Sequence, residues 1–431
     1  MSFDASFIKF SFIPWQPWSW ATSVLDRRTL WAAFLFISSG IAAPDAAAQN
    51  SLSAAYVVMG PQGAVARAVF EGTASCPKID FGVDQPSMDV RAQPSAGFPV
   101  TVCEKVMPPG TKSASILGGP LPVPLPIPKN SLASIVVLGD TRCRPAQQQN
   151  CNPNGWPFKK LSDNAAAYHP GLVIHVGDYL YRGKDTWENW KADFFDPARN
   201  LLTAAPWIVA RGNHEICTRG GGGYFRLLAD QNEPTQCEND TTDISPYTVM
   251  IGERQFIVFD SSGVPKSNDV NRYKEQFVKV AKLVKPHSWF ITHVPTWGVK
   301  GSGFIDDTLE QALENGDRDH ALLTNGELFL SGHIHLWEAI GFEKGPPQFV
   351  LGNGGANLAP PIRNEIRGRE LGGRKVDFWQ SALSWGFTRF TLTGEGGWTA
   401  TLEPGPGPSC TSTQGKVGCA SHQAAKTMGA R

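Results

Sequence analysis

The chain has 431 residues, of which 41% are hydrophobic and 18% are charged, so its composition is that of a globular protein rather than a disordered one. Its 39 lysines and arginines balance its 39 aspartates and glutamates, which gives no electrostatic reason to expect a nucleic-acid or membrane-surface partner. The 44 glycines and 33 prolines favour many short strands joined by turns over long helices.

Residues 1–49 are predicted to be a signal and targeting segment. Arg27 and Arg28 precede an apolar run from Leu30 to Ala43, and the small-residue stretch AAPDAAAQN follows it. This order is typical of a signal peptide, and the apolar run is short for a helix that crosses a membrane. We therefore expect an exported protein, periplasmic or secreted, with no stable membrane span after cleavage. An uncleaved anchor is the alternative.

The eight cysteines are predicted to form disulfides between neighbours in the sequence. The expected pairs are Cys76 with Cys103, Cys143 with Cys151, Cys217 with Cys237, and Cys410 with Cys419. Spacing alone does not fix the connectivity, and buried free thiols in a cytosolic protein are the alternative. Disulfides agree with the oxidising compartment to which a signal peptide leads.

Residues 50–130 are predicted to form a small β-rich module followed by a linker. Glycine and proline separate short β-like runs at 54–59, 64–70 and 98–103. The stretch GGPLPVPLPIPKN, at 118–130, holds enough prolines to exclude a helix and to favour extended chain.

Residues 131–404 are predicted to form a layered α/β catalytic domain. Continuous apolar runs, typical of strands buried on both faces, occur at 134–138, 172–176, 207–210, 255–259, 288–292 and 327–331. Helical patterns lie between several of them, such as the apolar face formed by Tyr273, Phe277, Val280, Ala281 and Val284. Residues 405–431 are predicted to be a tail, looped by Cys410 and Cys419.

Polar side chains follow five of these runs at the point where each strand is expected to end. They are Asp140, Asp178 with Tyr181, Asn213 with His214, His293, and His333 with His335. Each residue alone is typical of a cap, a turn or a structural histidine. Because ligands bind at the carboxyl ends of strands in open α/β sheets, we expect the whole set to converge as a metal site. In an extended segment, His333 and His335 would point to opposite sides and address two different ions.

The motifs, in order, resemble those of the calcineurin-like metallophosphoesterase superfamily. They are GDTR (139–142), GDYLY (177–181), GNHE (212–215), THVP (292–295) and GHIH (332–335). The resemblance covers roughly residues 132–355 and implies a four-layer α/β/β/α sandwich, with the small β-rich N-terminal module beside it. Tyr181 makes the chain most similar to the purple acid phosphatases, as a divergent bacterial member. Arg142 stands where those enzymes commonly have glycine.

The resemblance also implies two metal ions that share one carboxylate. The first ion would be held by Asp140, Asp178, Tyr181 and His335, and the second by Asp178, Asn213, His293 and His333. The first set, with two carboxylates and a phenolate, suits Fe(III). The second is richer in imidazole and suits Zn, Fe(II) or Mn, and ligand type alone leaves the pair open.

Two ions held close together lower the pKa of water to about 7 and offset charge on phosphate oxygens, so we expect hydrolysis of a small-molecule phosphate ester. His214 is expected to orient the phosphate or protonate the leaving group, since an ordinary histidine has a pKa of about 6.5. Arg142 is expected to pair with phosphate oxygens, the alternative being a surface ion pair. Phosphomonoester hydrolysis is the first interpretation. The alternatives are a phosphodiesterase or nucleotidase, with a base stacked on Trp187, Trp190 or Trp297, and a non-catalytic binding module.

Overall fold

The computed structural model describes residues 51–420 except positions 182, 231–242, 268, 302, 363, 394–396, 406 and 414–415. The predicted signal peptide and the end of the predicted tail lie outside these residues. The described residues belong to one compact unit. Among the described residues, no helix combines the length and the apolar character needed to cross a membrane.

Two large β-sheets carry the fold. The first contains, in spatial order, the strands β24 (Lys416–Ala420), β23 (Ser409–Thr413), β22 (Trp398–Glu403), β21 (Phe387–Leu392), β8 (Ser134–Leu138), β9 (Leu172–His175), β10 (Trp207–Val209), β1 (Leu52–Gly60), β2 (Gly63–Glu71), β5 (Val100–Val106) and β4 (Asp89–Ala92). The second contains β11 (Tyr247–Ile251), β12 (Arg254–Val258), β13 (Ser288–Ile291), β16 (Gly326–Ser331), β18 (Gln348–Leu351), β17 (Trp337–Phe342), β20 (Arg374–Ala382) and β19 (Glu370–Leu371).

The central strands of both sheets are parallel, as their continuous apolar runs predict. Strands β8, β9, β10 and β1 pair in parallel in the first sheet, and β12, β13, β16 and β18 do so in the second. Parallel strands end at the same edge of a sheet, so the loops that follow them lie together.

Side chains that alternate along these strands build three apolar layers. Ile135 and Val137 of β8 enter the core shared by the two sheets, together with Trp289 of β13. Val136 and Leu138 instead face the helices that cover the first sheet. Phe290, on the other face of β13, packs under the helices that cover the second sheet. Strands buried on both faces therefore require a helix layer on each outer side.

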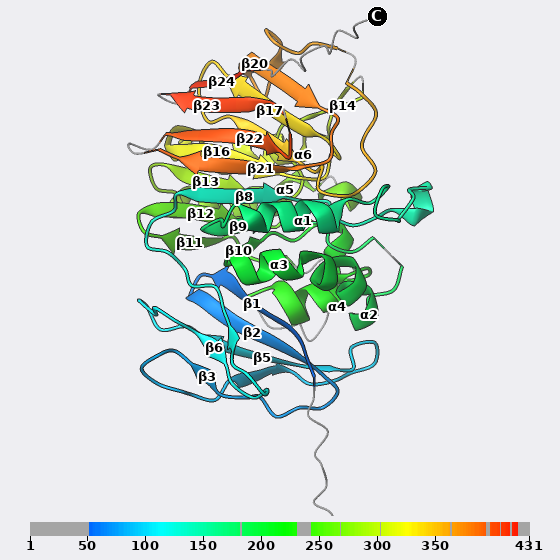
Figure 1. The fold of residues 1–431 in the computed structure, drawn as a ribbon. Coiled ribbons are helices and arrows are strands. Elements are labelled where there is room, and N and C mark those ends of the chain that lie inside the picture. The colour runs from blue at the N-terminus through cyan, green and yellow to red at the C-terminus, as the bar shows by residue number, and fades with distance from the viewer. Residues whose placement is uncertain are drawn as a thin grey trace, which may run out of the picture. The chain divides into compact units, whose positions relative to one another are not determined.

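The helices supply these two outer layers. On the first sheet lie α1 (Phe158–Ala167), α2 (Trp187–Trp190), α3 (Asp196–Ala204) and α4 (Gly221–Gly223), with the π-helical turns η2 (Lys191–Phe195) and η4 (Tyr224–Leu228). Figure 1 shows α1 and α3 against strands β8 to β10. On the second sheet lie α5 (Val270–Leu283), α6 (Thr308–Gly316) and α7 (Ala321–Asn325). The four-layer α/β/β/α prediction is confirmed, and α5 buries Tyr273, Phe277 and Val280 as its spacing predicts.

The strands of the β-rich N-terminal segment extend the first sheet instead of forming one of their own. Val58 of β1 pairs in parallel with Trp207 of β10, and β2, β5 and β4 follow outward. Within the proline-rich stretch, Val123–Pro124 forms β7, which joins β3 (Ile79–Asp80) and β6 (Ser115–Ile116) in a small sheet. Leu125 is buried, so this stretch packs against the fold.

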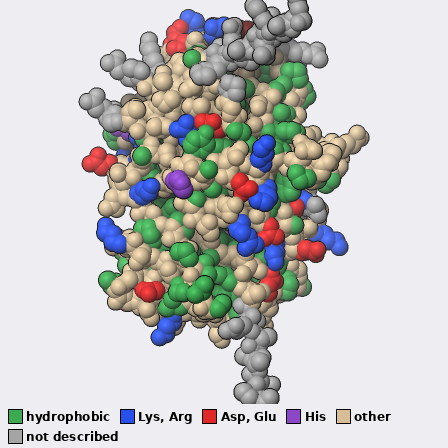
Figure 2. Space-filling model, viewed as in Figure 1, with side chains coloured by type: hydrophobic (Ala, Val, Ile, Leu, Met, Phe, Trp, Pro, Cys, Tyr) green, Lys and Arg blue, Asp and Glu red, His purple; other side chains and the backbone are tan. Residues whose placement is uncertain are grey.

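Three of the four predicted disulfides are present as predicted: Cys76–Cys103, Cys143–Cys151 and Cys410–Cys419. Cys217 is disulfide-bonded as well, and its expected partner Cys237 lies outside the described residues. On the face that Figure 2 shows, basic and acidic side chains are interspersed, in keeping with the net charge of zero.

Candidate metal centre

The five predicted strand ends meet at one place between the two sheets. Asp140 follows β8, Asp178 and Tyr181 follow β9, and Asn213 lies in the 3-10 turn η3 (Asn213–Glu215) after β10. The second sheet contributes His293, after β13, and the pair His333 and His335, between β16 and β17. The structure therefore brings together all seven residues predicted to bind metal.

One group of side chains gathers around Asp140. The hydroxyl of Tyr181 donates to Asp140 Oδ1 over 2.9 Å and lies 3.1 Å from His335 Nε2. His335 Nε2 is in turn 3.2 Å from Asp140 Oδ1. The carboxylate, phenol and imidazole expected to hold the first ion thus present their polar atoms to one another.

A second group gathers around Asn213. Its Oδ1 lies 3.0 Å from His293 Nε2 and 3.0 Å from His333 Nδ1. His293 Nε2 is also 3.3 Å from Asp178 Oδ1. Ligand atoms of Asp140, Asp178 and His293 all lie within 4.8 Å of one another. The Asp178 carboxylate is therefore within reach of both groups.

Three of these residues sit in the left-handed backbone region: Asp140 has φ 54°, Asp178 has φ 62° and His333 has φ 70°. Such strain is uncommon outside glycine and is concentrated at functional sites. At His333 it corrects one prediction, because residues 332–336 form tight turns and not an extended segment. His333 and His335 still reach different groups, but the turn separates them, not strand alternation.

Contacts behind the site fix the orientation of the ligands. His293 Nδ1 lies 2.8 Å from the carbonyl oxygen of Val176, and His335 Nδ1 lies 2.9 Å from that of Asn357. A ring that donates Nδ1–H to a carbonyl keeps its Nε2 lone pair for a metal. The carboxylates are held too, since Asp178 accepts from the His214 N–H over 2.9 Å and Asp140 from the His333 N–H over 2.9 Å.

Glu215 is a functional residue whose role the sequence did not reveal. Its buried carboxylate accepts four backbone N–H groups, those of Asp178, Tyr179, Leu180 and Gly212, over 2.8–3.1 Å. Glu215 therefore fastens the loop that carries Asp178 to the turn that carries Asn213. Glu215 is the fourth residue of the GNHE motif, and its place in that motif was the sequence signal that could have indicated its role.

The two loops approach so closely that glycine is required at Gly177 and Gly212. A Cβ at Gly212 would lie 2.2 Å from the backbone nitrogen of Asp178. Gly177 has φ +99°, and a Cβ there would lie 2.6 Å from His293 Nδ1. The glycines of GDYLY and GNHE thus let the two loops touch.

Charge at the site is arranged to receive cations. Although burial favours its neutral form, the charges of His293 and His214 hold the pKa of Asp178 well below its usual range. Burial works against a proton on His293, yet the Asp178 carboxylate beside it raises the pKa of His293 to about 9. Burial lowers the pKa of His333 to about 4, with the charge of His293 adding to the effect. The carboxylates thus draw positive charge to this spot.

The donor set fits a pair of metal ions. Two carboxylates, an amide oxygen, a phenol and three imidazoles offer their donor atoms within a few ångströms, and Asp140, Asp178 and His293 are almost wholly buried. Buried carboxylates are costly unless a cation or hydrogen bonds compensate them, so a cluster of this kind is well explained by bound metal.

His214 lies at the edge of this cluster. Its ring centre is 4.2 Å from that of Tyr181. Burial lowers the pKa of His214 to about 4, while Asp178 acts in the opposite direction and Arg219 and Arg144 add to the lowering. The ring is thus beside the expected metal ligands, and its action on substrate stays a prediction. Trp187, Trp190 and Trp297 are all buried core residues, so base stacking on them is excluded.

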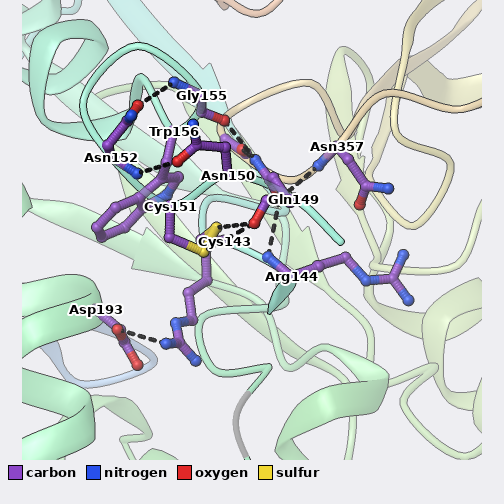
Figure 3. The surroundings of a disulfide bond; sticks show 12 residues. Cys143, Arg144, Gln149, Asn150, Cys151, Asn152, Gly155, Trp156, Asp193 and Asn357 are labelled. Carbon is purple, nitrogen blue, oxygen red and sulfur yellow. Dashed lines mark hydrogen bonds and ion pairs between the residues drawn. A yellow bond between two sulfur atoms is a disulfide. The ribbon is translucent and has the colours of Figure 1, made fainter. Parts of the chain in front are cut away.

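Arg142 does not face the site, contrary to prediction. It is fully buried, and its Nη2 pairs with Asp193 Oδ1 over 2.7 Å in the helical layer. The surface ion pair proposed as the alternative is therefore also wrong. Arg144, two residues on, reaches the site: its guanidinium lies 5.0 Å from the centre of the Tyr181 ring. Figure 3 shows Asp193 on one side of the Cys143–Cys151 bond and Arg144 extending on the other.

Known proteins resemble this chain over the segment that carries the site. The model of the family described as calcineurin-like phosphoesterase matches residues 133–337. The fold is similar to that of the purple acid phosphatase PPD1 from yellow lupin (Lupinus luteus), with 16% identity and a TM-score of 0.50 over 82% of this chain and 72% of that one. It is also similar to the structure of PhoD, with 12% identity and a TM-score of 0.55 over 89% and 95% of the two chains.

No curated protein matches the chain at a significant level. The two structural similarities show the fold alone. The family match covers the segment that carries all seven converging residues. The chain carries a calcineurin-like phosphoesterase domain and is a hydrolase that acts on phosphoric ester bonds.

Proposed function

We propose that this protein is an exported phosphomonoesterase whose dinuclear metal centre is held by the seven converging residues. The observation that carries the proposal is the position of Asp178, whose carboxylate lies beside His293 and within 4.8 Å of a ligand atom of Asp140. A single carboxylate between two sets of ligands offsets the repulsion of two neighbouring cations. Asp140, Tyr181 and His335 would complete the first site, and Asn213, His293 and His333 the second.

When bound, the two ions supply Lewis-acid chemistry, lowering the pKa of water and offsetting negative charge on the phosphate. The chain's own residues keep the ligands in place. Val176 and Asn357 fix the tautomers of His293 and His335 through their carbonyl oxygens. Glu215 keeps the Asp178 and Asn213 loops in register. His214, at the edge of the cluster, is the residue proposed to orient the phosphate or to protonate the leaving oxygen.

The metal pair is proposed to be Fe(III) with Zn, Fe(II) or Mn, as in the purple acid phosphatase branch that the GDYLY motif resembles. Tyr181 supports this choice because a phenolate is a hard ligand that suits Fe(III). We expect the oxidised protein to be violet from phenolate-to-iron charge transfer, and Tyr181→Phe to lose the visible band while it stays folded. Visible absorption with iron analysis measures this. A colourless, zinc-only protein of full activity would contradict the iron assignment.

Phosphomonoesters are the proposed substrates, and the purple acid phosphatase name of the lupin protein, whose fold is similar, supports them. The test is a survey of turnover on aryl and alkyl monoesters, diesters and nucleotides, run on one metal-loaded preparation. We expect kcat/KM to be highest for monoesters. A higher kcat/KM for a diester would reject the monoesterase proposal while leaving phosphoester hydrolysis intact.

Export to the periplasm or beyond the cell is proposed from two features. The N-terminal segment has the order of a signal peptide, and the described residues include three disulfides, which persist in oxidising compartments. Sequencing the N-terminus of protein recovered from the periplasm or medium tests this. A mature chain that begins at residue 1 and stays in the cytosol would contradict it.

A further inference from the structure

Arg144 reaches the metal centre from a loop closed by the Cys143–Cys151 disulfide. Besides lying over the Tyr181 ring, its Nη1 is 3.4 Å from His335 Nδ1. Arg142, on the other side of Cys143, turns inward to Asp193. The chain thus places one arginine in the helical layer and the next at the rim of the site.

The tautomer of His335 decides what Arg144 can do. His335 Nε2 lies among the atoms of Tyr181 and Asp140, so this nitrogen needs a free lone pair if it binds metal. Nδ1 then carries the proton, which it donates to the carbonyl of Asn357 over 2.9 Å. A protonated nitrogen cannot accept from a guanidinium, so the 3.4 Å approach of Arg144 is a packing contact. Within the part of the chain that the structure describes, no carboxylate forms an ion pair with Arg144 either.

A scaffold around Gln149 holds the loop in position. Gln149 Oε1 accepts from the backbone N–H of Arg144 over 2.8 Å and from that of Asn357 over 2.9 Å. Its Nε2 donates to the carbonyls of Gly155 and Gly355. Asn357, in the same segment, also accepts the hydrogen bond from His335 Nδ1–H through its carbonyl oxygen. Figure 3 shows Gln149 between Arg144 and Asn357. One side chain therefore sets the spacing between the backbone of Arg144 and a predicted metal ligand.

We propose that Arg144 binds the non-bridging oxygens of the substrate's phosphoryl group, the role that the sequence suggested for Arg142. The inference rests on the proposed function and deepens it. A guanidinium presents several N–H donors in one plane, which matches phosphate oxygens in geometry and charge. Because the disulfide and Gln149 hold its backbone in advance, less conformational freedom is lost when substrate binds.

The positive charges of Arg144 and Arg219 beside the site also bear on the class of substrate. The Arg144 guanidinium lies 5.0 Å from the centre of the Tyr181 ring, and the centre of the His214 ring lies 4.2 Å from the same point. Arg219 is exposed and donates to the carbonyl of Asn213 over 3.3 Å. Arginines beside the site favour the dianion of a phosphomonoester over the single charge of a diester. Arg144 is therefore inferred to contribute to selection of monoesters.

The test replaces Arg144 with methionine, which keeps most of the aliphatic length and removes the charge. Calorimetry on metal-loaded protein measures the affinity for inorganic phosphate, the product. Arg144→Met is expected to weaken that affinity about tenfold to hundredfold with unchanged metal content, as loss of a charge-assisted pair would. KM for a monoester is expected to rise more than KM for a diester. Arg199→Met, which removes an exposed arginine of α3 paired with Asp196, is the control and should match wild type.

A second variant tests the loop. Replacing Cys143 and Cys151 together by serine should weaken phosphate binding in the same direction as Arg144→Met but less, with metal content unchanged. Phosphate affinity within twofold of wild type in Arg144→Met would overturn the inference alone, provided that the wild type binds metal and hydrolyses esters. A wild-type protein that does neither would overturn the proposed function as well.

Discussion

Replacing His293 with alanine is expected to reduce kcat/KM for a phosphate ester by at least about a thousandfold. The reason is that Lewis-acid stabilisation is worth several kcal/mol, and each ~1.4 kcal/mol is a factor of ten in rate. His293 is buried and lies between the Asp178 carboxylate and the Asn213 amide, so alanine removes a ligand that no neighbour can replace. Asn213→Ala should lose activity for the same reason.

The measurement is steady-state turnover at saturating metal, with thermal melting to show that each variant is folded. The matched control is His169→Asn, since His169 is exposed, lies before β9 whereas Asp178 follows that strand, and has a left-handed φ of 48° that asparagine tolerates. The control should retain wild-type turnover. If His293→Ala and Asn213→Ala both keep more than a third of it, the metal centre has been assigned to the wrong residues.

Glu215→Gln is expected to lower both stability and turnover, although it changes one oxygen to an amide nitrogen. The carboxylate accepts four backbone N–H groups with two oxygens. A glutamine retains one acceptor oxygen and turns an NH₂ group toward the other two N–H donors. Each buried donor left without an acceptor costs about 1–3 kcal/mol, so the free energy of unfolding should fall by roughly 2–6 kcal/mol.

Urea unfolding with the disulfides intact measures that free energy, and a turnover assay on the same preparation reports the site. Turnover should fall because the hydrogen bonds from Glu215 no longer hold the loop of Asp178 against the turn of Asn213. Glu188→Gln, at an exposed position of α2, is the control for the chemical change itself and should leave both quantities unchanged. A Glu215→Gln protein with wild-type stability and rate would show that the four hydrogen bonds do not position the ligands.

The layered fold could be predicted because both faces of its central strands are apolar. Runs such as SIVVL bury every second residue between the sheets and the others under helices, which leaves a clear sequence pattern. The pattern does not say which sheet a strand joins. Pairing of Val58 with Trp207 depends on residues far apart in the sequence, so the strands of the N-terminal segment could be recognised but not placed.

The metal ligands could be predicted because strand ends are brought together by topology, whatever the loops do in detail. Residues beyond those ends could not be oriented in the same way. After Leu138 the backbone enters a left-handed turn at Asp140, so strand alternation no longer applies at Arg142 and Arg144. Arg142 was therefore predicted to face the site, but Arg144 lies there instead. The role of Glu215 was hidden because its partners come from a different loop.

Metal analysis of the purified protein, with turnover measured before and after chelation, shows whether the seven residues hold two ions on which catalysis depends. Seven side chains that converge on two sites should hold two ions per chain, and chelation should abolish turnover until iron and zinc are added back. Undiminished turnover in protein from which every ion has been removed would contradict a metal-dependent mechanism.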